Sequence, residues 1–207
     1  MPEQPPAVVG REMRDYYDRR AREYDEWWLG EGQYASLDRP GWHQEVDRLT
    51  SAVAGLPPAR WLDVACGTGF LTRHLPGEVT GLDQSGRMLA IARERVPAAT
   101  FVLGDALDLP FEDGTFERLF TSYFYCHLEE ADRLRFLAEA HRVADELIVM
   151  ASRPGDADEP LERWEERRLQ DDSRWRVYKR VFEPESLTAE LGGSVLHAGR
   201  WFVVVRA

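Results

Sequence analysis

Three aspartates and one glycine-rich turn are the residues whose types and spacing predict ligand chemistry in this chain. The stretch LDVACGTGF at 62–70 ends an apolar, β-leaning run at Asp63, and Gly67 and Gly69 follow directly. A glycine-rich turn between a strand and a helix is a frequent nucleotide site, because its backbone can approach the ligand closely. The sequence therefore predicts a nucleotide at this turn.

The aspartates Asp63, Asp83 and Asp105 each close a predicted strand. For one such acid, a solvated turn or a helix cap is an equally good interpretation. Three of them beside a glycine turn predict a shared binding edge, since ligands of open α/β sheets bind at the carboxyl ends of the strands. Asp83 is placed to accept both hydroxyls of a ribose, and Asp105 with the N–H of Ala106 is suited to the amino edge of an adenine.

The turn differs from that of a dinucleotide enzyme. A G-x-G-x-x-G turn has a third glycine for helix packing and presents backbone amides to a pyrophosphate. Here Thr72 takes the place of the third glycine, and Ala65 stands two positions before Gly67. A ligand with an adenosine and an amino-acid tail, but no phosphate, fits these residues better, with Asp63 as an acceptor for its ammonium group.

Composition narrows the class of protein. The 207 residues are 43% hydrophobic and 30% charged, which predicts one globular domain. A net charge of −11 disfavours nucleic acid as a partner. The absence of a long apolar run or a leader pattern predicts no membrane span and a cytoplasmic location. The two cysteines, Cys66 and Cys126, have no metal-ligand or disulfide spacing, so no metal is expected.

The hydrophobic pattern predicts alternating strands and helices, which indicates a parallel sheet covered on both faces. Strands are expected at 60–65, 78–83, 100–105, 116–123 and 146–152, and helices at 11–28, 41–56, from 70, at 85–96 with Ser85 as N-cap, and at 129–143. Helices at 159–170 and 184–191, an extended piece at 175–182, and two antiparallel strands at 194–199 and 200–207 complete the chain, and the Pro-rich residues 1–10 are expected to be frayed.

Four stretches in order, LDVACGTG, VTGLDQSGRMLAIAR, GDALDLPFEDGTFERLF and SYFYCHL, resemble the motifs of class I S-adenosylmethionine-dependent methyltransferases. The resemblance covers about 60–150, extends more loosely to YYDRRAREYDEWW, and is closest to small-molecule enzymes of the quinone type (type 11). Ala65 departs from it, because the family more often has glycine there. It implies an α/β, Rossmann-like fold: a doubly wound, seven-stranded, mostly parallel sheet with the last strand antiparallel, helices on both faces and a helical N-terminal lid.

The resemblance also implies a single methyltransferase domain over 1–207. Its expected parts are an N-terminal helical cap at 11–56, a cofactor-binding core at 60–152, an insertion or lid at 153–182, and a C-terminal helix and strands at 183–207. The implied cofactor is S-adenosylmethionine, with S-adenosylhomocysteine as product. The implied partner is a small-molecule acceptor, aromatic ones included, and the choice between monomer and homodimer stays open.

By the same resemblance, fifteen residues surround the cofactor. They are Tyr17, Tyr24, Asp63, Ala65, Cys66, Gly67, Thr68, Gly69, Asp83, Gln84, Met88, Gly104, Asp105, Ala106 and Ser122. For Tyr17 and Tyr24, closure over the methionine carboxylate competes with simple packing of an aromatic helix face.

The stretch SYFYCHL is expected to face the transferred methyl group. His127 is a candidate proton acceptor, with loop orientation as the alternative, and Tyr123 and Tyr125 are candidates to flank the sulfonium or the acceptor. In WRVYKRVF, the cations Arg176, Lys179 and Arg180 are candidates for an anionic substrate group, with a solvated strand face as the favoured alternative.

The function expected from these residues is methyl transfer to oxygen, nitrogen or carbon of a small molecule by in-line displacement. An accessory protein that binds the cofactor without turnover is one alternative. A nicotinamide oxidoreductase is another, disfavoured by Thr72 and by the lack of a second substrate domain.

Overall fold

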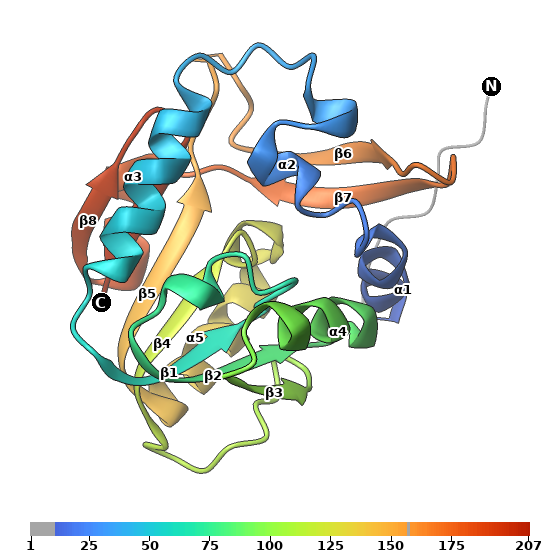
Figure 1. The fold of residues 1–207 in the computed structure, drawn as a ribbon. Helices are drawn as coiled ribbons and strands as arrows, with labels where there is room; N and C mark the ends of the chain where they lie inside the picture. The colour runs from blue at the N-terminus through green and yellow to red at the C-terminus, as the bar shows by residue number, and fades with distance from the viewer. Residues whose placement is uncertain (1–10, 157) are drawn as a thin grey trace.

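A seven-stranded sheet forms the centre of the computed structural model, which describes residues 11–156 and 158–207 (Figure 1). The prediction for residues 1–10 lies outside the described residues. In spatial order the strands are β3 (Thr100–Leu103), β2 (Gly77–Asp83), β1 (Ala59–Val64), β4 (Phe116–Ser122), β5 (Ala144–Ser152), β9 (Phe202–Arg206) and β8 (Ser194–Ala198).

The strand directions confirm the predicted fold class. The five strands from β3 to β5 run parallel, β9 is antiparallel to β5, and β8 is antiparallel to β9. From β1 the chain winds outward through β2 and β3, and then returns to β4 on the other side of β1. Because the winding reverses between β1 and β4, a crevice opens at their carboxyl ends, where doubly wound sheets bind ligands.

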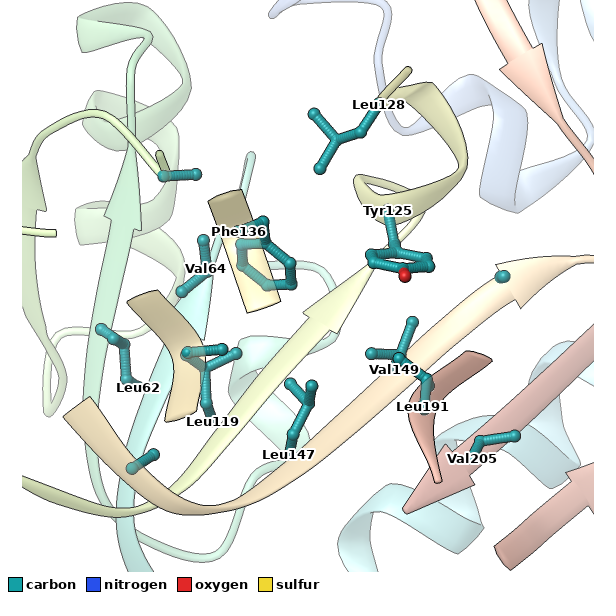
Figure 2. Close-up of a cluster of buried hydrophobic side chains, with 14 of the residues drawn as sticks. Leu62, Val64, Leu119, Tyr125, Leu128, Phe136, Leu147, Val149, Leu191 and Val205 are labelled. Carbon is teal, nitrogen blue, oxygen red and sulfur yellow. The ribbon is translucent and has the colours of Figure 1, made fainter. Parts of the chain in front are cut away.

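Both faces of the sheet are buried, because successive side chains of a strand point to opposite faces. Leu62 and Val64 of β1 belong to a core cluster with α5 (Glu130–Val143) and α6 (Pro184–Leu191), and Figure 2 shows the side chain of Val64 next to Phe136 of α5. Trp61, which directly precedes Leu62, belongs to the cluster on the other face, with α3 (Trp42–Ala54). The sheet is therefore covered by helices on both sides.

Four predicted helices are confirmed, within one or two residues at each end. They are α3, α4 (Gly86–Arg95), α5 and α6. Ser85 is the N-cap of α4, as predicted, since its hydroxyl accepts a hydrogen bond from the backbone N–H of Met88. The predicted antiparallel pair at the C-terminus is β8 with β9.

The single helix predicted over 11–28 is wrong. Helix α1 (Arg11–Arg20) ends early, a turn follows, and α2 covers only Glu26–Leu29. The turn lets the carboxylate of Asp25 reach the glycine turn, where it accepts a hydrogen bond from Thr68 Oγ1 at 2.6 Å. A tertiary contact of this kind overrides the helix propensity of the segment.

The helix predicted from 70 onward is also wrong, because only a 3-10 turn, η2 (Thr72–His74), forms there. The hydroxyl of Thr72 donates to Asp63 Oδ2 at 2.5 Å, which holds the turn against the buried end of β1. Burial raises the pKa of Asp63 to about 7, although the hydrogen bond from Thr72 opposes this shift.

The helix predicted at 159–170 is a strand. Residues Glu162–Arg168 form β6, which pairs antiparallel with β7 (Arg174–Arg180) in a separate two-stranded sheet. Glu165 forms ion pairs with Arg163 and Arg167. Residues two positions apart share a face in a strand but not in a helix, so the charges of this segment suit the strand.

The β6–β7 hairpin packs against the N-terminal segment (Figure 1). Tyr16 of α1 lies in a cluster with Leu169 and Val177, and Arg19 pairs with Asp171 beyond β6. Two segments far apart in sequence thus form one body beside the carboxyl edge of the sheet.

Replacement of Phe136 by alanine tests the core on the α5 face. The side chain is fully buried, so Phe136→Ala should lower the free energy of unfolding by about 3–5 kcal/mol. Leu134→Ala, on the exposed face of the same helix, should change it by less than about 0.5 kcal/mol. Denaturant unfolding measures both, and equal effects would contradict this account of the core.

The raised pKa of Asp63 predicts a pH-dependent stability. The unfolded side chain ionises near pH 3.9, whereas the folded one keeps its proton to about pH 7, so rising pH favours the unfolded state in this interval. The free energy of unfolding of Asp63→Asn minus that of the unsubstituted protein should therefore increase from pH 4 to pH 7. The increase is at most about 1.4 kcal/mol per pH unit.

Unfolding curves of both proteins from pH 4 to 8 measure this difference, which should level off above pH 7. A difference that stays constant over the whole range would show that Asp63 is ionised normally in the fold.

Candidate active site

A cavity of about 580 Å³ lies where the carboxyl ends of the central strands meet the N-terminal segment and the hairpin. Most residues that sequence reasoning assigned to a site line this one cavity. They are Tyr17, Tyr24, Ala65, Gly67, Asp83, Gln84, Met88, Gly104, Asp105, Ala106, Ser122, Tyr123 and His127. The topology brings them together from the N-terminal segment, the turn after β1, the end of β2, α4, the loop after β3, and the end of β4 with the loop that follows it.

Asp83, the last residue of β2, connects the cavity wall to the glycine turn. Its Oδ2 accepts a hydrogen bond from the N–H of Gly67 at 2.9 Å, and its Oδ1 accepts one from the N–H of Ser85 at 2.8 Å. Burial raises the pKa of this carboxyl to about 6, against the lowering effect of those two hydrogen bonds. Each oxygen keeps a further lone pair, so the group can still accept two hydroxyls.

Asp105 lines the same cavity from the loop after β3. Its Oδ1 accepts a hydrogen bond from the N–H of Leu107 at 2.9 Å, which fixes the loop, and its side chain is exposed. Gly104 is needed for packing, because a Cβ atom there would lie 2.8 Å from a methyl carbon of Leu82.

The glycine turn passes directly under an aromatic ring. A Cβ atom on Gly67, whose φ is +55°, would lie 3.5 Å from the ring of Tyr24, so little space separates the turn from the N-terminal segment. Ala65 also has a left-handed backbone, with φ of 56°. This conformation costs a residue with a Cβ atom about 1 kcal/mol, and it explains why glycine suits this position.

Five predicted site residues lie behind the cavity wall instead of in it. They are Asp63, Cys66, Thr68, Gly69 and Tyr125. Asp63 is buried at the end of β1, and its Oδ1 has no hydrogen-bond partner among the described residues. Gly69 serves packing, since a Cβ atom there would lie 3.3 Å from Cβ of Ala92 on α4. Cys66 is buried, 3.0 Å from where a Cβ atom on Gly81 would lie.

Thr68 holds the turn to the rest of the site. Its hydroxyl donates to Asp25 and accepts from Nη1 of Arg95 at 2.9 Å, while Asp25 and Arg95 form an ion pair. Sequence reasoning missed Asp25 and Arg95, because their roles depend on the turn that ends α1.

The prediction that Tyr125 faces the transferred methyl group is wrong in its geometry. Its ring is buried in the core on the α5 face (Figure 2), and its hydroxyl donates to Glu190 Oε1 of α6 at 2.7 Å. The 3-10 turn η3 (Tyr125–His127) directs Tyr125 and His127 to different surroundings, which alternation along a strand does not anticipate.

Tyr123 and His127 face the cavity from the loop after β4. Tyr123 has a left-handed backbone with φ of 57°, a strained conformation for an aromatic residue. Nδ1 of His127 donates to the carbonyl oxygen of Tyr178 in β7 at 2.7 Å, which leaves Nε2 as an acceptor. Burial and the nearby charge of Lys179 lower the pKa of His127 well below its usual value, so the imidazole is neutral.

The hairpin supplies two lining residues that sequence reasoning did not identify, Trp164 and Tyr178. A helix was predicted at 159–170, where the structure has β6. The sequence pattern therefore did not indicate that this segment forms a hairpin with β7 next to the carboxyl ends of the central strands. In the described part of the chain, no cluster of three or more His, Cys, Asp or Glu side chains has the form of a metal site. Across residues 11–156 and 158–207, no helix is long and apolar enough to cross a membrane.

Comparison with known proteins identifies this architecture. Residues 62–146 match the family described as Methyltransferase domain. A demethylmenaquinone methyltransferase of Symbiobacterium thermophilum is 35% identical over 156 residues, 68% of this chain and 58% of that protein. Its counterpart from Thermotoga maritima is 37% identical over 101 residues, 46% of this chain and 43% of that protein.

Solved structures extend the likeness to nearly the whole chain. The structure of a DhpI–SAH complex has a TM-score of 0.66 at 26% identity, and covers 93% of this chain and 92% of that one. By contrast, the chain spans about half the length of the curated relatives above. The sheet order, the acids at the strand ends and the matched residues agree, and the chain therefore carries a class I S-adenosylmethionine-dependent methyltransferase domain.

Proposed function

We propose that this protein transfers the methyl group of S-adenosylmethionine to a small-molecule acceptor. The observation that carries the proposal is the convergence of Asp83, Asp105 and the Gly67 turn on one cavity of about 580 Å³. The relatives named as demethylmenaquinone methyltransferases and the DhpI–SAH complex support the same assignment.

The residues around the cavity fit an adenosine with an amino-acid tail. Asp83 keeps free lone pairs for the ribose hydroxyls, and Asp105 with the N–H of Ala106 suits the adenine edge. Gly67 and Tyr24 adjoin the space for the tail. Asp63, buried behind the turn, is the acceptor that we propose for the ammonium group, because its Oδ1 has no hydrogen-bond partner among the described residues.

When bound, this cofactor supplies a methyl group already activated on a positively charged sulfur. The protein's own contribution is then alignment and the exclusion of water, and orientation alone can provide effective molarities of about 10⁵ M or more. Tyr17 and Tyr24 cover one side of the cavity, while Trp164 and Tyr178 of the hairpin cover another. For in-line transfer, Tyr123 and His127 would flank the space that the acceptor occupies.

For the acceptor we propose that His127 receives a hydrogen bond or a proton at Nε2. Its neutral state and its fixed Nδ1–H tautomer leave this nitrogen available throughout the physiological pH range. Tyr123 presents its ring to the same space.

We also propose the functional division of the domain that the sequence suggested. Residues 11–56 serve as a cap, 60–152 as the cofactor-binding core, and 153–182, which contain the β6–β7 hairpin, as the lid on the acceptor side. Residues 183–207 complete the sheet and its cover. The packing of the hairpin on α1 supports joint movement of cap and lid when the cofactor is exchanged.

Binding of S-adenosylhomocysteine tests the assignment of the cavity. Isothermal titration should show saturable binding, and Asp83→Asn should raise the dissociation constant about 10–100-fold, because charge-assisted hydrogen bonds to the ribose are lost. Asp47→Asn, an exposed change on α3, should leave the constant within about twofold.

Asp83 also holds the glycine turn, so thermal melting must show that Asp83→Asn folds, and Asp105→Asn provides a second, exposed position in the same cavity. Transfer of labelled methyl from S-adenosylmethionine to members of an acceptor library then separates an enzyme from a protein that only binds. Tight binding of NADH without any response to S-adenosylhomocysteine would overturn the proposal.

The charge state of His127 can be measured without knowing the acceptor. Nitrogen-15 NMR of the histidine side chains, with His127→Gln to assign the resonances, should show a neutral Nδ1–H tautomer that remains unprotonated from pH 8 down to about 6. A titration midpoint near 6.5 would contradict the burial and the neighbouring charge described here.

A further inference from the structure

A second, smaller cavity adjoins the first. Its volume is about 40 Å³, close to the roughly 30 Å³ that one water molecule occupies in the liquid, so it has room for one functional group. Tyr17, Tyr24, Tyr123 and His127 line both cavities. These four side chains therefore form the boundary through which a molecule in the large cavity can reach the small one.

Three cations meet at the small cavity: Arg20 from α1, Arg167 from β6 and Lys179 from β7. Arg20 and Lys179 are each only 7% exposed. No acidic residue is among those that line this cavity within the described ranges. In a chain with a net charge of −11, a buried wall of positive charge is opposite to the overall trend.

The partners of these cations only partly neutralise them. Arg20 donates to the hydroxyls of Tyr16 and Tyr34 at 3.1 and 3.2 Å, and its Nε has no partner among the described residues. Lys179 donates to Ser152 Oγ at 2.5 Å and contacts Cys126 Sγ at 3.5 Å. Neither side chain forms an ion pair with a carboxylate of the described residues.

Two carboxylates lie close behind the cations. Glu165 pairs with Arg167 but also with Arg163. Burial raises the pKa of Glu23, the charge of Arg20 opposes this shift, and Glu23 Oε2 accepts a hydrogen bond from the N–H of Gln170. The charge on the cavity side therefore stays positive. The three cations also act together on His127, since each lowers its pKa.

Buried charges without partners are costly, and proteins retain them where a ligand supplies the opposite charge. Arginine is suited to carboxylates and phosphate-like groups, because its planar donors match two oxygens at once. Resting on the function proposed above, we propose that the methyl acceptor carries an oxyanion, a carboxylate or a phosphorus oxyanion, which binds between Lys179, Arg167 and Arg20 while its nucleophilic atom faces the large cavity.

The geometry favours the acceptor over the cofactor as the source of this anion. Gly67, Asp83 and Asp105 line the large cavity and not the small one. Arg167 and Lys179 line the small cavity and not the large one. The ring of Tyr24 stands between them, against Gly67 on one side and at the small cavity on the other. Lys179 Nζ lies 4.9 Å from the ring centre of Tyr123, on the side proposed for the acceptor.

Matched ligands that differ in charge test this assignment. Protein saturated with S-adenosylhomocysteine is titrated with benzoate, phenylphosphonate and neutral benzamide at constant ionic strength, and tryptophan fluorescence reports occupancy because Trp27 and Trp28 line the small cavity. At least one anion should bind about tenfold or more tightly than benzamide. The stronger of the two anions identifies the class of oxyanion.

Lys179→Met and Arg20→Met should each weaken that anion about tenfold or more and leave benzamide unchanged. Arg174→Met, an exposed change at the start of β7, should leave all three ligands within about twofold. Circular dichroism and melting establish that each variant folds, and Lys179→Gln provides a second variant at the same position.

Three results would overturn the proposal. The first is equal affinity for the anions and benzamide, the second is no saturable anion binding below about 10 mM, and the third is anion binding that neither Lys179→Met nor Arg20→Met weakens. The first two results are also those expected if the cofactor's own carboxylate fills the small cavity. S-adenosylhomocysteine binding is measured separately in the same samples. Its absence together with intact anion binding would contradict the proposed function and leave the oxyanion site standing.

Discussion

The carboxylate of Asp83 is the group on which the site depends most. It ends β2, accepts the N–H of Gly67 from the turn after β1, and accepts the N–H of Ser85, which caps α4. One side chain thus joins two parallel strands, a glycine turn and a helix N-terminus, and these are the parts that must keep a fixed arrangement around a nucleoside. Burial of the group strengthens these hydrogen bonds, because little water competes for them.

The sheet and its carboxyl edge were predictable because their determinants are local. Alternation of apolar runs with helical segments, Ser85 as N-cap and the three aspartates at strand ends lie within short windows of sequence, and the sheet order follows from winding rules that hold for this class. The segments whose structure was predicted wrongly are those whose conformation depends on residues distant in sequence. The break after α1 serves a contact of Asp25 with Thr68, and β6 needs β7 as its partner.

The candidate site divides in the same way. Residues that follow a strand, such as Asp83 and Ala106, were identified from their place in a motif, and they line the cavity. Residues whose position depends on three-dimensional packing were not identified, or were assigned another role. A solvated strand face is the favoured prediction for Arg176, Lys179 and Arg180, yet Lys179 is buried, because its side of β7 faces the small cavity. Tyr125 was displaced from the cavity by a single 3-10 turn.

Two of the left-handed non-glycine residues, Ala65 and Tyr123, follow the neighbouring strands β1 and β4, on either side of the crevice where the winding of the sheet reverses. A domain with a total stability of about 5–15 kcal/mol can carry two such conformations, but they use a sizeable part of its margin. At the first of them an exchange between alanine and glycine shifts that margin by about 1 kcal/mol without altering the path of the backbone. An exchange at position 65 therefore changes the stability of the fold slightly and leaves the site intact. At position 123 the ring itself lines the cavity, so the strained backbone is retained together with the side chain.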